Sequence, residues 1–130
     1  MSDNKFTDWF KKLGKAWSER DPHQAVNLFS KDVEYYESVF DSSCDSLDKV
    51  LELWKVIPTN QKDVTFDFDI IATKNNLAVA NWRVTRTLLP MNKKQIIDGI
   101  FVIKLNDEGR CNYLKQWRTV KYAFSTLSVS

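Results

Sequence analysis

The second half of the chain contains four successive strand-like segments, and this feature constrains the fold more than any other. The segments are VTFDFDIIAT (64–73), LAVANWRVTRTLL (77–89), QIIDGIFVIKL (95–105) and CNYLKQWRTVKYAF (111–124). Each is rich in β-branched and aromatic residues, and short polar breaks separate one from the next. The pair Asn75-Asn76 suits a tight hairpin turn, because asparagine tolerates a positive φ. Together these features predict an antiparallel meander of four strands.

The first half of the chain is mainly helical in pattern. Apolar residues recur at helical spacing over residues 7–20 and again in LDKVLELWKVI (47–57), which Pro58 is expected to end. A shorter helix begins after Asp21, a residue that caps helix N-termini well. Between these helices, DVEYYES (32–38) alternates like a strand. Helices, one strand, a helix and then a meander predict an α+β fold, with about three N-terminal helices packed on one face of an antiparallel sheet.

Composition narrows the classes of partner. A chain of 130 residues with 43% hydrophobic residues predicts one domain over residues 1–130. A net charge of +2, without a basic stripe interleaved with aromatics, argues against a nucleic-acid partner. No run of eighteen apolar residues and no signal-peptide pattern occurs, which predicts a cytoplasmic protein without a membrane partner. Cys44 and Cys111 have no paired Cys/His spacing, so neither a disulfide framework nor a metal or other cofactor is expected.

Two segments carry a resemblance to a known family. WSERDPHQAVNLFSKDVEYYE (17–37) and DGIFVIKLNDEGRCNYLKQW (98–117) resemble the nuclear transport factor two-like superfamily, in its SnoaL-like and ketosteroid-isomerase-like branch. The resemblance covers nearly the whole chain and implies a cystatin-like cone, in which a curved sheet wraps over the helices with a pocket between. It also implies dimers that form through the outer sheet face. Enzymes, binding modules and transport adaptors share this cone, so the fold does not decide the function.

The resemblance implies one candidate catalytic residue. Ketosteroid isomerases use a carboxylate at the end of the first strand, and the matching position is Glu37. Their two oxyanion donors, a tyrosine and a protonated aspartate, are matched here by Leu13 and Phe101. A single oxyanion donor is worth roughly 3 kcal/mol of barrier. The absence of both donors therefore argues against that isomerase reaction.

A second branch of the superfamily, the limonene-epoxide hydrolases, holds water with an Asp–Arg–Asp set. Arg83 matches the arginine, while Thr85 and Gln116 stand where the two carboxylates belong. A neutral threonine and a neutral glutamine orient water but are poor acids and bases near neutral pH. The resemblance thus argues against this hydrolysis as well.

These matches imply which side chains face the pocket. They place Phe101, Leu114, Gln116 and Arg118 on the concave face of the sheet, where a partly solvated cavity would accept an amide and a charge that a dry core would not. Simple alternation would instead bury Trp82 and leave Arg83 in water, so the register of that strand stays open. The expected ligand-binding residues are Trp17, Tyr35, Trp54, Arg83, Thr85, Phe101, Gln116 and Arg118, with Glu37 as the candidate acid or base.

Three functions remain open at this point. One is an isomerase or hydrolase acting on a small apolar or polyketide- or steroid-like molecule. Another is a non-catalytic binding module in which Arg83, Arg118 and Gln116 hold a carboxylate or another polar group of a ligand. A third is a structural or adaptor dimer with a vestigial pocket. A homodimer is expected in each case, because apolar side chains on the convex face would form a patch too large to stay exposed. The residues of that expected patch are Trp82, Val84, Ile100, Val102, Tyr113 and Trp117.

Overall fold

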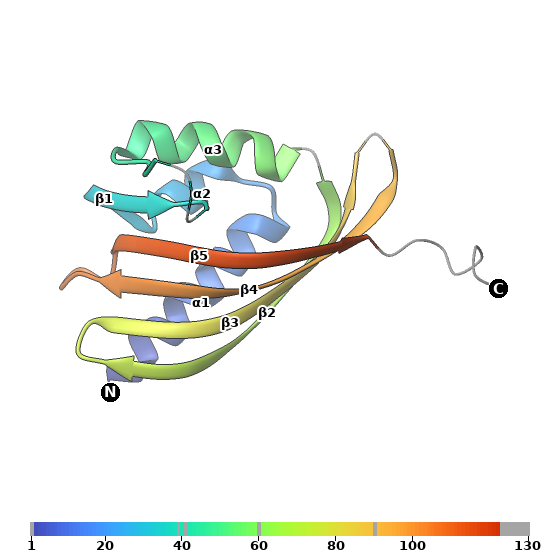
Figure 1. The fold of residues 1–130 in the computed structure, drawn as a ribbon. Helices are drawn as coiled ribbons and strands as arrows, with labels where there is room; N and C mark the ends of the chain where they lie inside the picture. Colours follow the sequence, from blue (N-terminus) through green and yellow to red (C-terminus); the bar gives the residue numbers. More distant parts are fainter. Residues whose placement is uncertain (1, 39, 41, 60, 90, 123–130) are drawn as a thin grey trace.

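The computed structural model describes residues 2–38, 40, 42–59, 61–89 and 91–122, and its elements follow the predicted order (Figure 1). The helices are α1 (Ser2–Ser18), α2 (Pro22–Val26) and α3 (Leu47–Thr59). The strands are β1 (Phe29–Tyr36), β2 (Gln61–Lys74), β3 (Leu77–Leu88), β4 (Lys93–Leu105) and β5 (Cys111–Tyr122). The α+β class and the four-strand meander are therefore confirmed. Ala123 and Phe124, the last two residues of the fourth expected strand, lie outside the described residues.

The strands form one sheet in the order β1-β5-β4-β3-β2. Strands β2 to β5 pair antiparallel with their sequence neighbours, whereas β1 pairs parallel with β5. The sheet curves strongly around α1, and α3 lies along β1 (Figure 1). This arrangement is the curved-sheet cone that the family resemblance implies.

Local signals in the sequence explain the ends of several elements. The Asp21 carboxylate accepts hydrogen bonds from the backbone N–H groups of His23 and Gln24, which caps α2. The Ser46 hydroxyl accepts one from the N–H of Lys49 at the start of α3. Asn75 adopts a φ of 55° in the turn between β2 and β3, as the asparagine pair predicts.

The strand β1 begins earlier than the sequence predicts. The predicted strand begins at Asp32, whereas Phe29 is the first residue of β1 and lies opposite Cys111 of β5. The backbone N–H of Cys111 donates to the carbonyl of Leu28 at 2.7 Å. Pairing with β5 draws Phe29 into the sheet, and no local pattern in the sequence indicates a strand partner that lies so far along the chain.

The register of β3 settles the alternative that the sequence left open. Trp82 and Val84 are buried, so their expected place on the convex face is wrong. The Trp82 ring stacks on Phe101, with ring centroids 4.7 Å apart and an interplanar angle of 12°. Gly99 lies directly opposite Trp82, and a Cβ at Gly99 would sit 2.9 Å from the indole. Because glycine leaves this space open, the large ring fits inside the sheet.

Arg83 consequently lies on the outer face of the sheet. Its Nε donates to the Asp98 carboxylate at 3.0 Å, and the arginine side chain is 59% exposed. Trp117 is also on this face, 45% exposed, as the sequence predicts. Among the residues that the structure describes, no helix has the length and apolar character needed to cross a membrane.

Candidate functional site

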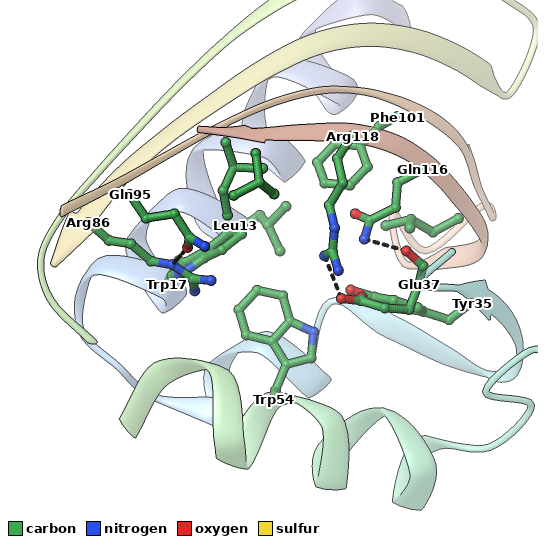
Figure 2. Close-up of a pocket in the computed structure, with 13 residues that line it drawn as sticks. Leu13, Trp17, Tyr35, Glu37, Trp54, Arg86, Gln95, Phe101, Gln116 and Arg118 are labelled. Atoms are coloured by element: carbon green, nitrogen blue, oxygen red, sulfur yellow. Dashed lines mark hydrogen bonds and ion pairs between the residues drawn. The ribbon is translucent and has the colours of Figure 1, made fainter. Parts of the chain in front are cut away.

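A cavity of about 190 Å³ lies between the concave face of the sheet, α1 and α3 (Figure 2). It combines an apolar interior with several polar groups. The lining residues are Leu13, Trp17, Tyr35, Glu37, Trp54, Arg86, Gln95, Ile97, Phe101, Leu114, Gln116, Arg118 and Val120.

Aromatic side chains from the helices and the sheet form the apolar part of the cavity. Trp17 of α1 and Trp54 of α3 meet edge to face, with ring centroids 5.4 Å apart. Phe101 extends this wall from β4, where the stacked Trp82 supports it from behind. All four side chains are almost completely buried. Such rigid walls favour an apolar, ring-containing or branched ligand over a strongly hydrated one.

The polar side of the cavity joins β5 to the segment after β1. Arg118 forms an ion pair with Glu37 at 2.7 Å, and the Gln116 amide donates to the Glu37 carbonyl at 2.8 Å. Gln116 is only 4% exposed. These contacts explain why a glutamine and an arginine occupy inward positions of β5, since each holds the chain at Glu37 across the cavity rim. Both bonds are drawn in Figure 2.

Tyr35 places a neutral hydroxyl beside this ion pair. Burial raises the pKa of Tyr35 well above its ordinary value, and the nearby charge of Glu37 raises it further. A hydrogen-bonding contact with Trp54 lowers the pKa of Tyr35, but by less than burial raises it. The Trp54 Nε1–H still has no hydrogen bond of standard geometry to any described residue. The cavity therefore presents two buried donors, the Trp54 N–H and the Tyr35 O–H, close to the Glu37 carboxylate.

Arg86 is a lining residue that the sequence analysis missed. Its Nε donates to the Gln95 side-chain oxygen at 2.7 Å, and its Nη1 donates to that of Gln61 at 2.6 Å. The Trp17 indole donates to the same Gln61 oxygen at 3.0 Å. Burial lowers the pKa of the Arg86 guanidinium, and the positive charge of Arg118 lowers it further. The alternation of β3 could have identified Arg86 from the sequence, because residues 82, 84 and 86 share one face of a strand.

Most of the expected site residues surround this cavity, and two do not. Trp17, Tyr35, Glu37, Trp54, Phe101, Gln116 and Arg118 line it. Arg83 and Thr85 do not line it, so their expected place in the pocket is wrong. Both lie on the outer face of β3, because Trp82 and Val84 face inward. The Thr85 hydroxyl instead contacts that of Thr65 on β2. Binding or catalysis by any of these residues stays a prediction.

The cavity opens toward the surface beside the ion pair. A second hollow, of about 340 Å³, shares Glu37, Gln116 and Arg118 with the cavity and continues to Phe40, which is 94% exposed. Val120, 41% exposed, marks another point at which the cavity lining reaches the surface. Within the described part of the chain, no three histidine, cysteine or carboxylate side chains gather as a metal site would require.

The fold and the cavity together define a cone of the nuclear transport factor two-like class. A family model for the SnoaL-like domain matches residues 8–113. The chain therefore belongs to the SnoaL-like family. A comparison with curated proteins found no match.

Solved structures with the same fold include enzymes and a designed binder. The epoxide hydrolase/cyclase-like enzyme SalBIII, described in pyran ring formation in polyether salinomycin, is 15% identical and has a TM-score of 0.77, covering 94% of this chain and 95% of its own. Δ5-3-Ketosteroid isomerase from Mycobacterium sp. is 10% identical, with a TM-score of 0.72 over 92% and 98% of the two chains. A computationally designed 17-OHP binder is 14% identical, with a TM-score of 0.75 over 92% and 97%. At these identities the likeness concerns the fold.

Proposed function

We propose that this chain binds a small molecule in the cavity, with the apolar part of the ligand against Trp17, Trp54 and Phe101. The observation that carries the proposal is the cavity itself, which the protein's own aromatic side chains leave open while polar groups line it at both ends. An adaptor with a vestigial pocket has no need of such a space. The use of the same cone by SalBIII, a ketosteroid isomerase and a designed binder supports a ligand-binding role.

Blocking the cavity is expected to abolish ligand binding without unfolding the protein. Val120→Trp places a large ring at the exposed edge of the lining, and we expect affinity to fall by about tenfold or more, because the ring occupies volume that the ligand needs. Native mass spectrometry of co-purified ligand and a thermal-shift screen of small aryl and alkyl compounds measure the effect.

The neighbouring substitution Thr119→Trp is the matched control. Thr119 lies on the outer face of the same strand, opposite Asp98, and is not part of the cavity lining. It should leave ligand binding unchanged. Equal responses of both variants and of the unmodified protein to every compound would contradict the proposal.

A second candidate function is proton transfer to or from the bound molecule by Glu37. Glu37 lines the cavity and is held in place by its ion pair with Arg118, and a carboxylate is a group that can accept a proton. The neutral Tyr35 hydroxyl lines the same cavity and can donate a hydrogen bond to a ligand oxygen. Leu13 and Phe101 occupy the matched oxyanion-donor positions, so this chemistry would differ from that of the ketosteroid isomerases.

We also propose that the chain forms a homodimer through the convex sheet face. With Trp82 and Val84 inside, the remaining patch consists of Ile100, Val102, Tyr113 and Trp117, and Lys104 and Lys115 lie over its two aromatic rings. An apolar centre bordered by lysines is typical of a protein interface. The expected cytoplasmic location likewise stays a prediction.

The dimer is expected to depend on Trp117. Trp117→Lys should shift a micromolar sample from dimer toward monomer in sedimentation velocity, because two like charges would face each other across a twofold axis. Lys121→Ala, an exposed change nearer the end of the same strand, serves as the control. A monomeric unmodified protein at micromolar concentration would contradict the prediction.

A further inference from the structure

The guanidinium of Arg86 lies in the cavity wall, and no carboxylate of a described residue is in direct contact with it. Its two hydrogen bonds go to the neutral amide oxygens of Gln95 and Gln61. Among the described residues, no acidic side chain lies within ion-pair distance of it, whereas Arg83 on the outer face is paired with Asp98. A partly buried charge without a counter-charge is costly, and proteins usually pair it. Its presence in the lining of a cavity therefore needs an explanation.

The charges of the lining residues do not cancel. Arg86 and Arg118 contribute two positive charges, and Glu37 contributes one negative charge that Arg118 already neutralises at 2.7 Å. The lining therefore carries one net positive charge, and Arg86 is the arginine that has no carboxylate of a described residue in contact with it. Figure 2 shows Arg86 and the Arg118–Glu37 pair on either side of Trp54. At one end of the lining the charges of Arg118 and Glu37 form an ion pair, and at the other end the charge of Arg86 has no such partner among the described residues.

The contacts of Arg86 orient it for recognition of a planar anion. Gln95 and Gln61 hold the Nε and one Nη1 hydrogen, and the Trp17 ring lies 6.0 Å from the guanidinium carbon. A guanidinium has five N–H groups in a fixed fork, so the remaining ones stay available to a ligand. Because the fork is held from behind by buried amides, a ligand would not have to order it on binding.

We propose that the ligand of this cavity is a monoanion, an aryl or alkyl carboxylate, whose carboxylate binds Arg86 while its apolar part packs against Trp17, Trp54 and Phe101. The inference rests on the proposed small-molecule binding and names the class of that molecule. One unbalanced positive charge calls for one negative charge, and a carboxylate matches the planar fork of arginine. A cavity of about 190 Å³ with aromatic walls suits a compact apolar body rather than a dianionic phosphate ester.

Matched pairs of neutral and charged compounds test this proposal. Phenylacetate and cinnamate are compared with phenylacetamide and cinnamamide by isothermal titration calorimetry, with inorganic phosphate as a third probe. We expect each carboxylate to bind about tenfold or more tightly than its amide, since hydrogen bonds to a charged partner are the stronger ones. Equal affinities of acid and amide would overturn the carboxylate proposal while leaving small-molecule binding intact. Phosphate binding as tight as that of the carboxylates would overturn it too. Binding of neither acid nor amide would count against the proposed binding as a whole.

Variants assign the effect to Arg86. Arg86→Met should abolish the preference for the acid over the amide, and Arg83→Met, an arginine three residues away on the outer face, should retain it. If Arg86→Met proves unfolded by circular dichroism, Arg86→Lys keeps the charge and should retain a reduced preference, because an ammonium lacks the fork. A preference that survives Arg86→Met, or that is lost in Arg118→Met alone, would show that Arg86 is not the anchor.

Discussion

Trp82→Ala is expected to lower the free energy of unfolding by about 3–5 kcal/mol, the usual cost of removing a buried aromatic side chain. Trp82 is 1% exposed, and its ring stacks on Phe101 and lies 5.9 Å from the Trp17 ring. Removal leaves a cavity that the flanking strands cannot close, because β3 is paired along both of its edges. Urea denaturation followed by circular dichroism measures the change. Since Phe101 and Trp17 both line the ligand cavity, weaker ligand binding should accompany the lower stability.

The adjacent residue supplies the control. Arg83→Ala removes an exposed ion pair with Asp98, and such pairs are worth less than about 1 kcal/mol. The two substitutions together test the strand register directly. If Arg83→Ala cost more stability than Trp82→Ala, the assignment of inner and outer faces of β3 would be reversed.

Glu37→Gln is expected to lower turnover by about 10²–10⁴-fold if the bound molecule is also a substrate, which is the usual contribution of a general acid or base. Glutamine keeps the size of glutamate and can still accept a hydrogen bond from Arg118, so binding should change much less than kcat. The measurement is kcat and KM on the first compound found to be converted. Full activity of this variant would exclude Glu37 as the proton-transferring group and would assign the reaction to another group of the cavity.

Glu34→Gln is the matched control for this experiment. Glu34 lies three residues earlier, on an exposed position of β1, and its carboxylate accepts a hydrogen bond from Tyr36 away from the cavity. Glu34→Gln removes one negative charge from the same part of the chain as Glu37→Gln does. A comparable loss of turnover in both variants would indicate a long-range electrostatic effect instead of proton transfer at Glu37.

The two arginines of β3 show how closely a functional prediction depends on strand register. Arg83 and Arg86 are both in a segment of alternating residues, and the family resemblance selected Arg83. Adjacent strand positions face opposite sides of a sheet, so a shift of one position exchanges the two faces. The cavity therefore contains Arg86, and the anion recognition once expected of Arg83 is proposed for a residue three positions further on.

Local patterns in the sequence determined the elements and the general architecture. Helical spacing, the Asp21 cap, the Asn75 turn and the four alternating segments each depend on neighbours within a few residues, and all appear in the structure. The inward positions of Gln116 and Arg118, and the exposed position of Trp117 between them, follow from the family resemblance and are present in the structure. For these residues the resemblance placed the register of β5 correctly.

Only the tertiary structure decided the register of β3, the early start of β1 and the partners of the polar side chains. Trp82 is inside because Gly99, seventeen positions along the chain, leaves space for its ring. Phe29 belongs to β1 because β5 pairs with it, and Arg86 is held by Gln61 and Gln95 from two other strands. In each case the deciding contact joins residues of different strands. Periodicity indicates which residues of one strand share a face. It does not indicate which residues of the paired strand will contact them.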